Sequence, residues 1–422
     1  MYPIVSLLLA IGTAGALCAD ETTWEEATLA QVWAWAEEES PSVQSRLMES
    51  RAYELAARGE DRERLPSLYV ESTADGGQRV SPGEERALGI SARANVHARA
   101  EWVFLDPGAH GDQRSARLQV EEALASALSE ADLERRAVSS LYFDLLAAQD
   151  QTKAARSRVE LVDAVADVVE RRVEAGVETP SAAARAQRSR RDARQALAEA
   201  ATATELARAR LAATIGRCVH PVDDVERGPA PPGADSDAPS ETPEVTHLLR
   251  RSERLSAEAD AARSRDAFSA RAFGAAGLYA SRAYDRPIEP EYFLGVTARW
   301  QPDLFGVRRV RAESLEVFAE AARDEAHRRQ DQLDQRASQL ATEAATLTAE
   351  IDDLREAIAA EEGELERVRS RWEQGVAPWS DVLDAADRLY TLQNRYSDAS
   401  RRLRQVNVSW AAATGTLTPL TD

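Results

Sequence analysis

Apolar and polar residues alternate with a period of two in two separate parts of the chain. From Leu88 to Trp102 an apolar side chain occupies every second position, with Gly, Ser, Arg, Asn, His or Glu between. This period is typical of a β-strand with one apolar and one polar face. A shorter candidate strand precedes each alternating stretch. The predicted strands are Leu65–Glu71, Leu88–Trp102, Gly277–Tyr284 and Tyr292–Trp300, with turns over Asp75–Glu85 and Asp285–Pro290.

After each strand pair, apolar residues recur in alternating steps of four and three, the spacing of a coiled-coil seam. The seam runs from Leu141 to Val173 in the first half of the chain and from Leu333 to Trp372 in the second half. A return helix carries a further seam from Val382 to Trp410. At 1.5 Å per residue, a helix over residues 108–175 would be on the order of 100 Å long.

Each long helix ends near a glycine that can adopt the backbone angles of a tight turn, Gly176 or Gly375. A proline follows soon after, at Pro180 or Pro378, where it would start the next helix. We therefore predict two helical hairpins, each closed at one of these glycines.

The chain is an internal duplication of this strand pair and hairpin. Three landmarks of the first copy recur 198 or 199 residues later. They pair as Arg172–Val177 with Arg371–Val376, Gly216 with Gly415, and Trp102 with Trp300. The fold is therefore expected to be mainly α with a small β part, in two repeats.

The apolar run Ile4–Ala19 is too short to span a bilayer and ends in small residues suited to cleavage, so it predicts a signal peptide. Lipid attachment at Cys18 is the weaker alternative, because Leu17 stands where a small residue is wanted. Proline-rich sequence separates the repeats. The predicted segments are signal peptide 1–19, repeat one 20–216, linker 217–242, repeat two 243–416 and tail 417–422.

Composition narrows the function classes. Charged residues make up 29% of the chain and aromatic residues 6%, which favours long helices packed on small side chains. A net charge of -20 argues against nucleic acid as a partner. No nucleophile elbow, phosphate loop or metal-ligand spacing is present in the sequence. We therefore expect no catalytic residues, no cofactor, no metal and no enzyme activity.

The Trp-containing strand ends, the duplication, the two Arg-x-x-x-Gly-Val helix ends and the segment Gly375–Ala385 together resemble the TolC-like outer-membrane efflux proteins. The resemblance implies a homotrimer in the outer membrane of a Gram-negative bacterium, with a β-barrel of about 12 strands and an α-helical periplasmic tunnel. It also implies a passive exit duct for a tripartite efflux or type I secretion system. The partners would be a periplasmic adaptor (membrane fusion protein) and an inner-membrane pump.

By the same resemblance, Asp381 and Asp384 line the tunnel entrance, where rings of carboxylates would attract cations. The alternative is that Asp381 only favours the first turn of its helix through the helix dipole. The sequence alone leaves both interpretations open. Ala377 and Trp372 depart from the family's entrance lock, so a polar latch is not expected.

The hairpin turns are the expected contacts of the adaptor, although they could also be plain turns. The residues concerned are Arg172, Gly176, Val177, Arg371, Gly375 and Val376. Trp102 and Trp300 are expected at the membrane interface of the barrel, with packing anchors as the alternative. The competing class is a structural or adaptor-type periplasmic coiled-coil protein, which would explain the helical seams but not the recurring strand pairs.

Overall fold

The computed structural model describes residues 25–63, 65–78, 90–221, 242–265, 268–281, 286–300 and 302–417. The predicted signal peptide and most of the predicted linker lie outside these residues. The chain forms two compact units, and each contains parts of both repeats. We call the described residues of Met1–Ser45, Ala127–Pro243 and Arg329–Asp422 the helical body, and those of Arg46–Ser126 and Glu244–Arg328 the strand unit.

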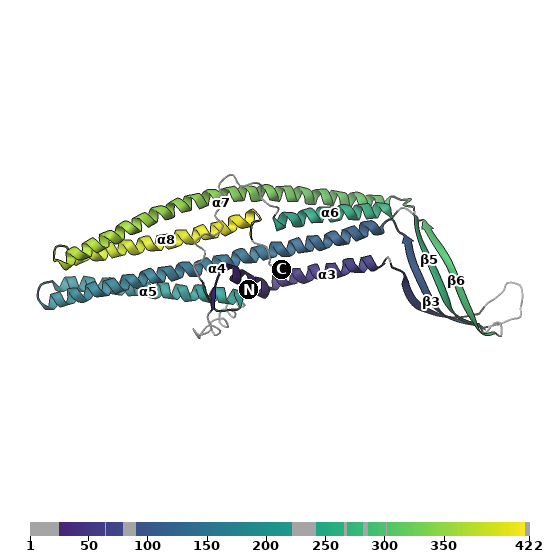
Figure 1. Ribbon diagram of the computed structural model, residues 1–422, viewed down its shortest axis with the longest axis horizontal. Helices are drawn as coiled ribbons and strands as arrows, with labels where there is room; N and C mark the ends of the chain where they lie inside the picture. The colour runs from purple at the N-terminus through teal and green to yellow at the C-terminus, as the bar shows by residue number, and fades with distance from the viewer. Residues whose placement is uncertain are drawn as a thin grey trace. The chain divides into compact units, whose positions relative to one another are not determined.

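Four long helices dominate the helical body, and two of them, α4 and α7, continue into the strand unit. They are α4 (Ala109–Glu174), α5 (Pro180–Ile215), α7 (Val307–Glu373) and α8 (Trp379–Ala413). Both predicted hairpins are confirmed, since α4 is followed by α5 and α7 by α8. In Figure 1 the helices lie in the order α7, α8, α4, α5, with both hairpin turns at the same end.

Polar contacts between neighbouring helices agree with this order. Thr152 on α4 and Thr204 on α5 share a hydrogen bond of 2.9 Å. The Nε2 of Gln405 on α8 donates to Ser140 on α4 at 3.0 Å. Arg388 on α8 donates to Glu361 on α7 at 2.9 Å. Among these four helices, α5 and α7 are therefore the outer members of the row.

The predicted seams form its core. Buried seam residues include Leu145, Val162, Val169, Leu340 and Leu354. Burying apolar surface contributes roughly 25 cal/mol per Å² to the free energy of folding. The continuous seams therefore stabilise the contacts between the helices. The residues spaced by four and three thus lie buried between helices, as the sequence predicted.

A small element that the periodicity did not predict fastens the N-terminal part of the helical body. Strand β1 (Glu25–Ala27) pairs in parallel with β4 (Val219–Pro221), and the Tyr142 hydroxyl donates to the Ala27 carbonyl at 3.0 Å. Helix α2 (Leu29–Glu39) follows and starts with a capping box on Thr28. Strands of three residues are too short to show a period.

A buried ion trio holds α2 against α4. The Arg135 side chain is only 5% exposed, contacts Glu37 through Nε, and places Nη1 3.2 Å from Asp132. Two carboxylates therefore share one guanidinium in the interior. Burial raises the pKa of Asp132, and Arg135 and Arg136 oppose that rise.

The strand unit contains a four-stranded antiparallel sheet in the order β2, β3, β5, β6. Helices α3 and α6 lead into its two strand pairs. The bounds are α3 (Pro41–Glu63), β2 (Ser67–Gln78), β3 (Ile90–Leu105), α6 (Pro243–Ser264), β5 (Phe268–Ser281) and β6 (Arg286–Trp300). Both predicted strand pairs are confirmed. Among the described residues, no helix has an apolar stretch long enough to cross a membrane.

The strands are longer than the period-two stretches. Strand β2 continues to Gln78, inside the predicted loop over Asp75–Glu85, and β5 begins at Phe268 rather than near Gly277. The predicted turn over Asp285–Pro290 was wrong from Arg286 onwards. Pro290 is paired with Leu278 there. Proline is tolerated because β6 is an edge strand, where a missing N–H need not cost a ladder hydrogen bond.

Candidate functional site

One face of the sheet consists of apolar side chains that point away from the protein. Cross-strand pairing aligns every second residue of the four strands on this face, for example Ala100 with Gly274 and Gly274 with Leu294. Leu294 is 91% exposed and Leu68 80%. The exposed members are Leu68, Val70, Val96, Trp102, Leu278, Tyr292, Leu294, Val296 and Trp300. A continuous apolar face of this kind marks a surface that is covered in the functional state.

The opposite face is polar and internally paired. The His97 ring is 8% exposed, and its Nε2 lies 3.3 Å from Glu291. Arg99 lies 3.6 Å from Glu71, and Glu101 accepts a hydrogen bond from Arg271. Charged residues thus lie on this side of the sheet, where they contact the rings of Phe273 and Phe293, and apolar residues, mostly aliphatic, cover the other side.

The sheet closes tightly around the His97 ring because its partner across the strands is Gly277. A Cβ atom at Gly277 would lie 2.1 Å from the Val96 carbonyl oxygen and 2.2 Å from the His97 ring. Distances this short exclude any side chain at that position. Glycine is required here by contact with the backbone of β3.

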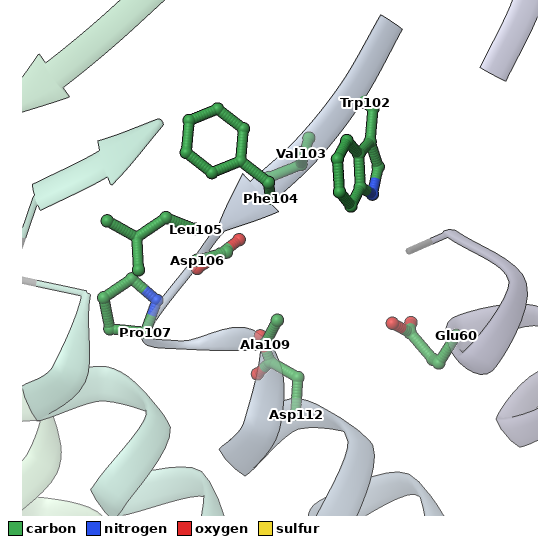
Figure 2. A pocket seen from close by; sticks show the side chains of 9 residues that line it. All are labelled: Glu60, Trp102, Val103, Phe104, Leu105, Asp106, Pro107, Ala109 and Asp112. Atoms are coloured by element: carbon green, nitrogen blue, oxygen red, sulfur yellow. The ribbon is translucent and has the colours of Figure 1, made fainter. Parts of the chain in front are cut away.

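Trp102 and Trp300 lie near the strand ends that lead into α4 and α7, and both are exposed. Trp102 borders a pocket of about 620 Å³ at the end of β3, together with Glu60, Phe104 and Asp106 (Figure 2). The Asp106 carboxylate already accepts from Gly108 N at 3.0 Å. The positions of Trp102 and Trp300 at the strand ends are compatible with the membrane interface predicted from the sequence. That role stays a prediction.

The two hairpin turns have the same geometry. Gly176 has φ 72° and Gly375 φ 78°, in the left-handed region that favours glycine. Val177 N donates to the Arg172 carbonyl at 2.9 Å, and Val376 N donates to that of Arg371 at 2.8 Å. These bonds satisfy the last carbonyls of each helix. The valines are exposed, so each turn presents an apolar tip.

Two tryptophans join the hairpins close to these turns. Trp372 and Trp379 are buried in an apolar cluster with residues of both hairpins. The Arg172 guanidinium lies 5.6 Å from the Trp372 ring centre, and that of Arg185 lies 5.8 Å from Trp379. Arg172 is thus partly engaged within its own chain. The sequence pattern did not identify Trp379 or Arg185 as part of the hairpin ends.

Asp381 and Asp384 are exposed on the first turns of α8, and neither has a polar partner among the described residues. Asp387, further along the same helix, accepts from Arg158 on α4 at 2.8 Å. Pro378, the N-cap residue, makes no side-chain capping bond, and Asp381 places a carboxyl group in the first turn of α8. Both interpretations of these carboxylates therefore stay open. The described residues include no group of three or more His, Cys, Asp or Glu placed to hold a metal ion.

Comparison with known proteins shows a family to which part of the chain is similar, and a shared fold. Residues 35–217 match the model of the family described as outer membrane efflux protein. No curated protein matches the chain.

Solved structures share the fold over nearly the whole chain. The outer membrane protein VceC of Vibrio cholerae is 16% identical, with 92% of this chain and 96% of that chain covered and a TM-score of 0.71. The CmeC outer membrane channel of Campylobacter jejuni is 12% identical, with 96% and 91% covered and a TM-score of 0.73. The open state of the Neisseria gonorrhoeae MtrE outer membrane channel is 18% identical, with 92% and 89% covered and a TM-score of 0.68.

The predicted fold class and the resemblance seen in the sequence are confirmed by these matches. The sequence match lies in the first repeat, and the shared fold extends over both repeats. Residues 35–217 are thus similar to the outer membrane efflux protein family, and the chain as a whole shares the fold of the solved outer membrane channels.

Proposed function

We propose that this chain is the outer-membrane exit duct of a tripartite efflux or type I secretion system in a Gram-negative bacterium. It would conduct substrates passively, with the energy supplied elsewhere. The observation that carries the proposal is the four-stranded sheet, whose apolar face is exposed and whose outer strands are β2 and β6. A sheet with two open edges and one apolar face is unsuited to water and to lipid as a single copy.

Closure by symmetry would satisfy both edges. Each copy supplies four strands, so three copies would give a barrel of about 12, within the size range of membrane barrels. With the apolar face towards lipid, His97, Arg99 and Glu101 would face a water-filled lumen. This arrangement gives these three side chains a polar environment, which supports a homotrimer.

Trp102 and Trp300 would then lie at the membrane–water interface, where indole rings are enriched. Their position at the strand ends next to the helices supports this role. Packing anchors at the junction of strand and helix are the alternative, and loss of membrane insertion on replacement by Ala would separate the two.

The helical hairpins would continue the lumen as a periplasmic tunnel. The two turns would meet a periplasmic adaptor and, through it, the inner-membrane pump. The exposed Val177 and Val376 support a contact with a partner, because each turn presents an apolar tip to solvent. The proposed contact residues are Arg172, Gly176, Val177, Arg371, Gly375 and Val376.

Asp381 and Asp384 would line the tunnel at its entrance. Three copies would bring six carboxylates together and favour cations over anions. Because conduction needs no bond making or breaking, the duct would have no enzymatic activity, in keeping with a family of channels.

A structural or adaptor-type coiled-coil protein is the competing class. It would account for the helices, but not for a sheet that exposes Leu294 and Leu68 while burying His97. Membrane fractionation separates the classes. The duct should sediment with the outer membrane as an oligomer that resists SDS and dissociates on boiling, and its deletion should abolish export of its substrates. Recovery as a soluble periplasmic monomer would refute the proposal.

A further inference from the structure

The two outer helices of the helical body carry opposite charge near their hairpin turns. Over residues 180–194, α5 has five arginines and one aspartate. Over residues 352–366, α7 has seven carboxylates and one arginine. The basic stretch and the acidic stretch belong to the same chain but to different hairpins.

Part of the charge on each helix is used inside the molecule and part is left over. On α5, Arg190 and Arg194 each lie 2.9 Å from Asp163 of α4. Arg188 and Arg191 are exposed and have no partner within the described part of the chain. The free arginines therefore point away from the hairpin.

The same division holds on α7. Glu361 is half-buried and bonds Arg388 of α8. Glu356, Glu362 and Glu366 are exposed, and none has a partner in the described ranges. Between them Gly363 is open, since a Cβ added there would meet nothing within 4 Å. This acidic surface has room for long side chains from outside.

The two surfaces cannot meet within one copy because α4 and α8 lie between α5 and α7 (Figure 1). The two stretches overlap in height between nine and 18 residues from the turns, where α5 has five arginines and α7 has four glutamates. Nearer its turn, α7 carries Arg367, Arg369 and Arg371. Arg185 lies nine residues from Gly176, and Glu366 lies nine residues from Gly375. Arg188 and Glu362 lie 12 and 13 residues from the same glycines, which at about 1.5 Å per residue is nearly one level.

We propose that the basic surface of α5 docks against the acidic surface of α7 in a second copy of this chain. The contact is heterologous, so each copy offers one surface to each neighbour, and it closes into a ring when the rotation between copies allows. This inference rests on the assembly in the proposed function and names the surfaces that join its entrance half. Exposed ion pairs are weak and screened by salt, so the contact sets register and holds more loosely as ionic strength rises.

Photo-crosslinking tests the contact directly. The full-length protein in its own membrane carries p-benzoylphenylalanine in place of Arg188. Irradiation should give a product of twice the chain mass, with the crosslink mapped by mass spectrometry to residues 352–366. The same probe in place of Arg156, an exposed arginine on α4, should give no such product. No dimer product from position 188, or a crosslink to another protein instead, would overturn the proposal.

Exchanging the charges tests whether ion pairs hold the contact between α5 and α7. The pair Arg188→Glu and Arg191→Glu should lower the yield of SDS-resistant oligomer several-fold at low salt. Adding Glu362→Arg and Glu366→Arg should restore it, which a general folding defect would not allow. Unchanged yield in the double variant, or no recovery in the fourfold variant, would refute the ion-pair contact.

Export measured in parallel separates this inference from the proposed function. Crosslinked oligomers that do not export would refute the duct and leave the contact standing. Normal export without the crosslink would refute the contact and leave the duct standing.

Discussion

The sheet and the helical body place their apolar side chains in opposite ways. Leu294 on the sheet is almost fully exposed while His97 is buried, whereas Tyr142 and Leu145 of the helical body are fully buried. With lipid over the apolar face of the sheet, as proposed, both arrangements keep apolar surface out of water. The comparison teaches that the surrounding solvent decides which face of an element is apolar. Four sets of substitutions follow from the two environments, taken from the largest expected effect to the smallest.

Arg135→Leu should destabilise the helical body by about 3–5 kcal/mol, because it leaves Glu37 and Asp132 without their shared cation in a dry interior. Because burial raises the pKa of Asp132, its contribution to stability is fully present at low pH and is lost as pH rises through that pKa. The deficit should therefore shrink on acidification.

Urea unfolding of the detergent-solubilised protein at pH 7 and pH 5, followed by circular dichroism, measures this deficit. Arg136→Leu is the matched control, since Arg136 is exposed one residue away and its loss should change stability by about 0.5 kcal/mol or less. A loss of stability in Arg135→Leu that is larger at pH 5 than at pH 7 would contradict the role given to the Asp132 carboxylate.

Leu294→Arg should cost about 2–4 kcal/mol if the side chain faces the middle of the bilayer. Val96→Asp on β3 should impair assembly for the same reason. The sequence predicts the same of Ile90 and Ala92, whose side chains lie outside the described residues. The control is Thr297→Arg on the other face of β6, which should assemble normally. Equal yields of membrane-inserted oligomer for Leu294→Arg and Thr297→Arg would show that the two faces of the sheet do not meet different solvents.

Gly176→Val and Gly375→Val should each cost about 1–2 kcal/mol locally, because both positions have positive φ. No neighbouring atom lies within 4 Å of an added Cβ, so the strain is confined to the turn. The double variant should still assemble but lose export and crosslinking to the adaptor. Gly59→Ala, in helix α3 and equally open, should change neither. Full export by the double variant would remove the turns from the functional account.

Asp381→Asn with Asp384→Asn should have the smallest effect on stability, about 0.3–1 kcal/mol through the helix dipole. If the carboxylates line the entrance, cation selectivity in a planar bilayer at low salt should fall as well. Asp324→Asn, on an exposed part of α7, controls for the change in net charge. Selectivity that stays unchanged would leave only the role in starting α8.

The sequence predicted those parts of the fold in which one period extends over many residues. The coiled-coil seams and the alternation up to Trp102 are of this kind. It failed where another strand decides the conformation, as at Pro290, which is held by pairing with β5. The turn glycines could be predicted because left-handed backbone angles require them. The joining of the hairpins by Trp379 and Arg185 could not, because that contact links segments far apart in sequence.

The glycine opposite His97 limits how the strands of the sheet can vary over evolution. If Leu68 and Leu294 face lipid, as proposed, they meet a fluid without fixed shape, so Leu, Ile, Val and Phe should replace one another freely there. Gly277 meets the backbone of its neighbour, and not even alanine fits there. A scan of all single substitutions should therefore find tolerance on the most exposed apolar positions and strict intolerance at a residue that has no side chain.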